Sequence, residues 1–108
     1  MQIAKSRPPT VRIIALVRNR LEGLPGYELI ARGLADLESG IDTPPALLVA
    51  VGAPRLRVLG LTVPVCPDHP EHRLYEQLAS DDPDSAHTRY NALIRRLVSF
   101  ERALACVA

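Results

Sequence analysis

The feature that most constrains this chain is a run of apolar residues near its C-terminus, spaced alternately four and three residues apart. The run consists of Ala86, Tyr90, Leu93, Leu97, Phe100, Leu104 and Val107. This spacing places the side chains on one face of an α-helix, and it holds over three full heptads. It predicts a continuous helix over about 83–106 whose apolar stripe, here called the seam, must be covered by other protein. Ile94 and Val98 widen the stripe.

The first half of the chain shows a similar helical pattern. Residues 27–40 carry an apolar stripe that predicts a helix ended by Gly40, and Gly33 inside it suggests close packing against a neighbour. The stripe is formed by Tyr27, Ile30, Leu34, Leu37 and Ile41. Residues 10–23 predict a further helix, although β-branched residues within 11–17 leave a strand open. The short turn between these helices predicts an antiparallel hairpin.

Prolines and glycines divide the middle of the chain. We expect a short helix over 43–52, a further helical turn over 54–60, an extended segment over 61–67 and a short helix over 70–79. Asp68 and Glu71 have the spacing of a capping box before the last of these. The sequence thus predicts an all-α fold: one domain over 1–108, a small bundle of about five helices preceded by an irregular arm over 1–9.

Composition and charge limit the classes of function. The net charge is +1 in 108 residues, so no long-range field favours nucleic acid or anionic lipid. The longest uncharged stretch, 43–54, is too short to cross a bilayer, and we expect a cytoplasmic protein without a membrane partner. Cys66 and Cys106 are expected to be free thiols, although a bridge between them stays open.

One cluster has side chains suited to metal or thiol chemistry. Cys66, His69 and His72 lie within seven residues, and thiolate and imidazole are ligands that zinc prefers. The spacing lacks the second ligand pair of a zinc finger, and prolines stiffen the segment. No glycine-rich phosphate loop accompanies it. A small metal- or thiol-dependent enzyme centred on these residues is therefore an alternative, and we predict no catalytic residue and no cofactor.

Arginines suggest a second alternative. Lys5 is the only lysine, which is typical of a GC-rich genome. Rows of arginine can follow phosphates, and the candidates are Arg55, Arg57, Arg95 and Arg102. The nearly neutral charge and the scarcity of aromatic residues do not favour a nucleic-acid-binding protein.

The leading hypothesis is a non-enzymatic protein-interaction or regulatory module. It acts through the seam of the last helix and predicts a homodimer or a complex with another protein. The expected interface consists of Tyr90, Leu93, Leu97, Phe100 and Leu104, with Arg89 and Arg96 setting the register. Coverage of the seam within the same chain, by the two N-terminal helices, remains open at this point. Leaving two or three seam side chains exposed to water would reduce the stability of the fold by several kcal/mol, at roughly 0.8 kcal/mol per buried methylene.

Overall fold

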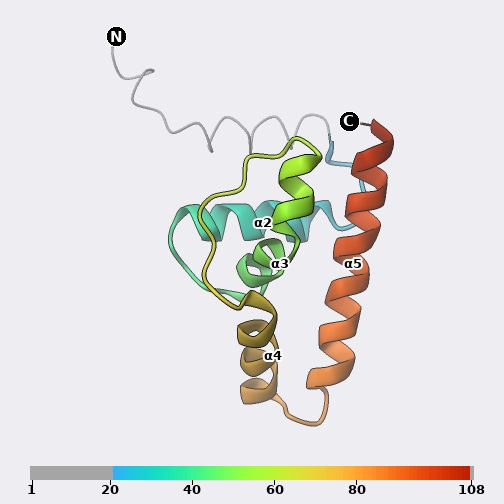
Figure 1. Ribbon diagram of the computed structural model, residues 1–108. Coiled ribbons are helices and arrows are strands. Elements are labelled where there is room, and N and C mark those ends of the chain that lie inside the picture. Colours follow the sequence, from blue (N-terminus) through green and yellow to red (C-terminus); the bar gives the residue numbers. More distant parts are fainter. Residues whose placement is uncertain (1–20, 108) are drawn as a thin grey trace.

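The computed structural model describes residues 21–107. Within this range the chain forms four α-helices and no strand, and the helices pack into a compact bundle (Figure 1). They are α2 (Tyr27–Glu38), α3 (Pro44–Val58), α4 (Pro70–Asp81) and α5 (Ala86–Val107). The predicted all-α fold and long C-terminal helix are confirmed. The predicted arm 1–9 and the helix-or-strand question at 11–17 lie outside the described residues, as does most of the predicted helix 10–23 with its hairpin.

Helix α2 follows the predicted stripe closely. It begins after Gly26, whose φ of 78° lies in the left-handed region that glycine adopts easily. Its four predicted apolar positions from Tyr27 to Leu37 are buried, whereas Ile41 lies beyond the helix and is 51% exposed. Gly33 faces α3 so closely that a Cβ there would lie 2.3 Å from the carbonyl oxygen of Pro45. The close packing predicted at this glycine is therefore confirmed.

Helix α3 is one continuous helix, so the prediction of two short helices is wrong. Thr43 caps it as expected, accepting a hydrogen bond from the Ala46 amide at 3.3 Å. Gly52 and Pro54, expected to end one helix and to begin another, both lie inside it. Burial on both sides of Pro54, at Ala53 and Leu56, favours continuation over the break that proline usually causes. Gly52 instead makes room for α5, because a Cβ there would lie 2.8 Å from Leu97 Cδ1.

The segment from 61 to 67 has no helix or strand hydrogen bonding, which agrees with the expected extended chain. Helix α4 then begins after His69, which takes a left-handed conformation with a φ of 52° and makes no side-chain cap. The predicted capping box is therefore wrong. Pro70 occupies the first helical position, where its missing amide costs nothing.

Helix α5 starts three residues later than predicted, after a turn organised by Asp82. The Asp82 carboxylate accepts hydrogen bonds from the Asp84 amide at 3.2 Å and the Ser85 hydroxyl at 2.8 Å. The helix then runs antiparallel to α4 and past α3 (Figure 1). Although it has 22 residues, no helix within 21–107 is long and apolar enough to cross a bilayer.

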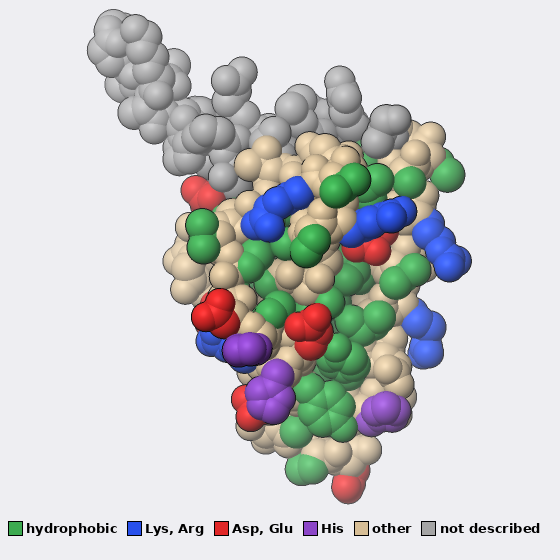
Figure 2. Space-filling model, viewed as in Figure 1, with side chains coloured by type: hydrophobic (Ala, Val, Ile, Leu, Met, Phe, Trp, Pro, Cys, Tyr) green, Lys and Arg blue, Asp and Glu red, His purple; other side chains and the backbone are tan. Residues whose placement is uncertain are grey.

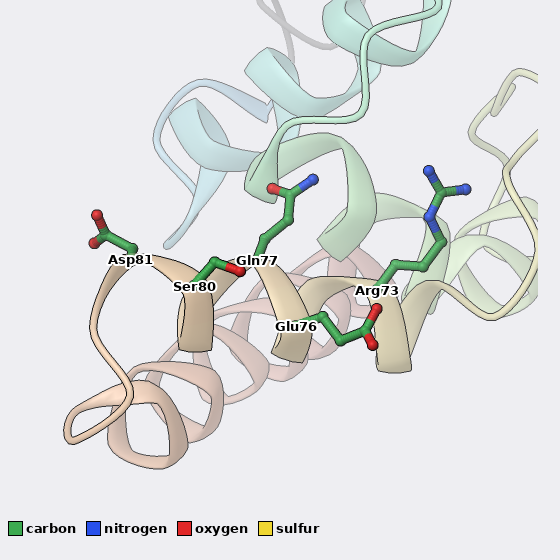
Figure 3. Close-up of a pocket in the computed structure, with 5 residues that line it drawn as sticks. All are labelled: Arg73, Glu76, Gln77, Ser80 and Asp81. Atoms are coloured by element: carbon green, nitrogen blue, oxygen red, sulfur yellow. The ribbon is translucent and has the colours of Figure 1, made fainter.

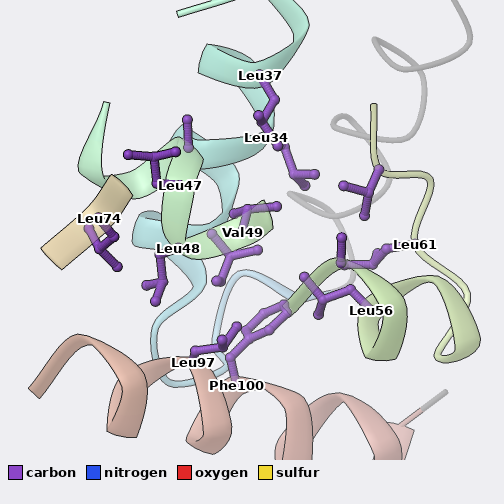
Figure 4. Packing of buried hydrophobic residues seen from close by; sticks show 14 of the residues in the cluster. Leu34, Leu37, Leu47, Leu48, Val49, Leu56, Leu61, Leu74, Leu97 and Phe100 are labelled. Carbon is purple, nitrogen blue, oxygen red and sulfur yellow. The ribbon is translucent and has the colours of Figure 1, made fainter. Parts of the chain in front are cut away.

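The core lies where α2, α3 and α5 meet. Leu97 and Phe100 project from α5 toward Leu48, Val49 and Leu56 of α3 (Figure 4). Leu74 extends this cluster to α4. Burying such side chains contributes about 1.5–3 kcal/mol each, so these contacts hold the bundle together.

Candidate functional site

The seam of α5 is divided between the core and the surface. Leu97, Phe100 and Leu104 are 3%, 0% and 3% exposed in a single copy of the chain. Tyr90 and Leu93 are partly buried. Among the described residues, α3 and α4 cover the seam. The sequence analysis had left open its coverage by the two N-terminal helices. The interface stays a prediction, but three of its expected residues, Leu97, Phe100 and Leu104, are buried in the core of the chain.

One edge of the seam, widened by Ile94 and Val98, reaches the surface of α5. It consists of Tyr90, Ile94 and Val98, one helical turn apart and all partly exposed, and it is joined by Tyr75 of α4. We call these four residues the apolar flank. Figure 2 shows hydrophobic side chains gathered on this face, over the line where α4 and α5 meet. Patches of this kind at a helix pair are typical of contact surfaces.

Two tyrosines anchor the apolar flank. The rings of Tyr75 and Tyr90 meet edge to face, with centroids 5.7 Å apart and planes at 60°. Tyr75 is 38% exposed. Burial, together with the nearby Glu71 carboxylate, raises the pKa of the Tyr90 phenol above its ordinary value, so this ring is neutral near pH 7. The pair is a rigid aromatic surface that needs little ordering to bind a partner.

The charges beside the apolar flank differ between its two edges. Glu71 lies one turn before Tyr75, on the α4 edge. Arg95 and Arg102, seven residues apart, lie on the outer side of α5 and are exposed. Within residues 21–107, none of these three side chains forms an ion pair. An unpaired acid on α4 and two unpaired arginines on α5 thus accompany the apolar flank.

The two arginines expected to set the register differ in their contacts, because only Arg89 forms an ion pair among the described residues. Arg89 forms an ion pair with Asp81 at 2.8 Å and so ties the start of α5 to the end of α4. Arg96 lies on the opposite side, at a shallow hollow shared with Pro25 and Ser99. Its carbonyl oxygen would lie 3.1 Å from a Cβ on Gly26. Both residues thus contribute to packing inside the chain.

The cluster of Cys66, His69 and His72 is not brought together. No group of three His, Cys, Asp or Glu side chains within residues 21–107 could hold a metal ion. The Cys66 thiol donates to the Pro64 carbonyl at 3.3 Å, whereas His72 faces Glu76 at 3.1 Å. Cys66 and Cys106 are free thiols, which resolves the question of a bridge.

The four arginines of the nucleic-acid alternative lie on two different helices. Arg57 donates to the carbonyl oxygens of Val63 and Pro64 at 3.2 and 3.0 Å, holding the 61–67 segment against α3. Arg55 lies near Glu101, whose pKa is raised by burial and lowered to a lesser extent by that arginine. Of these four arginines, Arg55, Arg95 and Arg102 form no ion pair among the described residues.

An open hollow on α4 is lined by charged and polar side chains: Arg73, Glu76, Gln77, Ser80 and Asp81 (Figure 3). Arg73 and Gln77 point to the same side of the helix, toward the loop before α3. There Arg73 pairs with the Asp42 carboxylate, and Gln77 donates to the Asp42 carbonyl at 2.7 Å. These groups therefore join α4 to that loop.

Sequence reasoning did not identify Tyr75 as a candidate site residue. The available signal was its position beside Leu74 and Leu78 in the predicted helix 70–79. An aromatic residue next to a narrow two-residue apolar stripe lies at the border of the buried face, where it can contact both the core and a partner.

In comparisons with known proteins, no family model, no curated protein and no solved structure matches the chain.

Proposed function

We propose that this protein is a non-enzymatic interaction module that binds a protein partner through the apolar flank of α4 and α5. The observation that carries the proposal is the Tyr75–Tyr90 pair, which is held rigidly at the surface and continued along α5 by Ile94 and Val98. Tyrosine is enriched in protein interfaces because it offers a large contact area at a low cost in conformational entropy.

The proposal restricts the part of the expected interface that lies on α5 to the exposed side of that helix. The buried residues Leu97, Phe100 and Leu104 support the helix from within, and the exposed side of the same helix presents the flank. Covering a partly exposed aliphatic side chain such as Ile94 would add roughly 25 cal/mol per Å² of apolar surface removed from water. A regulatory or accessory role follows from binding of this kind.

Nucleic-acid binding is the second candidate function. Arg95 and Arg102 support it because they share one side of α5 and have no ion-pair partner among the described residues. It is the weaker candidate because the Arg57 guanidinium already binds two carbonyl groups. A function in which a metal or thiol acts at Cys66, His69 and His72 finds no support in their separate contacts.

The proposed function is tested by sedimentation velocity on the full chain. The protein concentration is varied over about 5–200 µM, roughly the range in which weak protein interfaces associate. We expect the wild type to self-associate and Ile94→Asp to sediment as a monomer. Thr88→Asp, which places the same charge on an exposed position of α5, is the matched control and should associate like the wild type. Equal helicity by circular dichroism shows that both variants fold. A wild type that is strictly monomeric throughout, and that also binds no hydrophobic probe dye at the apolar flank, contradicts the proposal.

A further inference from the structure

We propose that the partner at the apolar flank is a second copy of this chain, in a symmetric dimer whose two-fold axis runs along the flank, parallel to α5. In this dimer Arg95 and Arg102 of each copy face the Glu71 edge of α4 in the other. The inference rests on the proposed function and adds to it the identity and orientation of the partner.

The first support is the opposite charge of the two helices that border the flank. Helix α4 contains three acidic side chains and one arginine, whereas α5 contains four arginines and one glutamate. Only one ion pair joins them inside the chain, between Arg89 and Asp81. Glu71, Arg95 and Arg102 form no ion pair among residues 21–107. A second copy supplies the missing partners.

The second support comes from symmetry. A contact between two identical surfaces is isologous, so each residue meets its partner twice. If the two-fold axis crossed the flank, α5 would lie on α5 and Arg95 would approach its own copy, which like-charge repulsion opposes. If the axis runs along the flank, α5 lies on the partner's α4 and opposite charges meet. The charge distribution therefore selects the second arrangement.

The register of the two helices agrees with this arrangement. Helices α4 and α5 are antiparallel, and the Tyr75–Tyr90 contact fixes their relative height. Glu71, four residues before Tyr75, therefore lies near the height of Ile94 and its neighbour Arg95. Rotation about an axis parallel to α5 preserves this height. The Glu71 and Arg95 side chains of different copies are then brought to the same level across the interface.

The test is a charge exchange between the two edges, read by sedimentation equilibrium of the full chain. We expect Glu71→Arg and Arg95→Glu each to raise the dimer dissociation constant at least ~10-fold, because each places like charges across the interface. The double variant Glu71→Arg/Arg95→Glu should recover to within about 3-fold of the wild type. Glu38→Arg, an exposed change on α2, is the control and should have no effect.

The outcomes separate this inference from the function on which it rests. If the wild type dimerises and Ile94→Asp abolishes dimerisation, but the double variant is as weak as the single ones, the proposed axis is wrong and the proposed function stands. Dimerisation that is insensitive to both charge changes overturns the inference in the same way. A wild type without self-association overturns this inference, and it overturns the proposed function as well if the chain also binds no hydrophobic probe dye. Circular dichroism of each variant excludes loss of folding as the cause.

Discussion

Two regions of this molecule use the same long helix in different ways. The packed region consists of α2, α3 and the C-terminal half of α5, and the hairpin region consists of α4, the 82–85 turn and the N-terminal half of α5. In the packed region, backbone and side chains approach so closely that Gly33 and Gly52 leave no room for a Cβ. In the hairpin region, an ion pair between Arg89 and Asp81 joins the helices, and a tyrosine pair reaches the surface.

Under the proposed function, this difference means that one helix serves both stability and recognition. Its C-terminal half is covered by α3, so the hydrophobic effect there stabilises the fold. Its N-terminal half is covered only in part by the narrow helix α4, which buries just Leu74 and Leu78. The apolar surface left over, at Tyr90, Ile94 and Val98, is partly exposed. We therefore expect substitutions in the two regions to separate folding from association.

The largest expected effect is that of Phe100→Ala in the packed region. Phe100 is fully buried, and its truncation should lower the free energy of unfolding by about 3–5 kcal/mol. Tyr90→Ala, ten residues earlier on α5, should cost at most about half as much because its ring is partly exposed. Urea denaturation followed by circular dichroism gives both values. If Phe100→Ala does not fold, Phe100→Leu provides the comparison, and equal losses at the two positions would remove the distinction between the regions.

The next effect concerns the contact between α2 and α3. Gly33→Ala would place a Cβ 2.3 Å from a backbone oxygen, which cannot move aside as a side-chain end can. We expect a loss of about 2–3 kcal/mol, larger than the small gain that alanine usually brings inside a helix. The same denaturation experiment measures it, with Gly23→Ala as the control, since no described atom lies within 4 Å of a Cβ at that position. A stabilised Gly33→Ala variant would show that the packed region is loose.

The smallest effect is a pH dependence in the packed region. Burial raises the pKa of Glu101 above its ordinary value of 4.5, so the folded state favours the neutral carboxyl. The neutral Glu101 carboxyl contributes fully to stability below its ordinary pKa. This contribution is lost as the pH rises through the raised pKa of the folded state. Glu101→Gln should therefore increase the free energy of unfolding at pH 7. The increase should be less than about 0.5 kcal/mol, because water still reaches this partly buried group. At pH 4 we expect no increase. Thermal unfolding at both pH values checks this. Glu38→Gln, at an exposed position, should show no such difference.

Sequence periodicity was sufficient for the helices whose faces are amphipathic. The alternating spacing from Ala86 to Leu104 and the stripe of α2 correctly predicted two helices, because burial on one face dictates such patterns. Local signals failed where contacts between helices decide the outcome. Gly52 and Pro54 resemble a helix end, yet both lie inside α3, where Gly52 makes room for Leu97.

The candidate site was predictable only in part. The sequence placed Tyr90, Ile94 and Val98 on one helix, but it could not show which seam residues the rest of the chain would bury. Tyr75 and Tyr90 come together through the α4–α5 turn, and no pattern within either helix reveals that contact. The local partner of Arg89 likewise depends on the pairing of the two helices.

Asp42 has a consequence for the surface on the other side of α4. Its carboxylate binds Arg73 and its carbonyl binds Gln77, so a single residue before α3 contacts two successive turns of α4. A rigid helix transmits a change of tilt from one face to the opposite one. Under the proposed function, we therefore expect a ligand or modification that acts on the 39–43 loop to alter binding at Tyr75 without touching the aromatic pair.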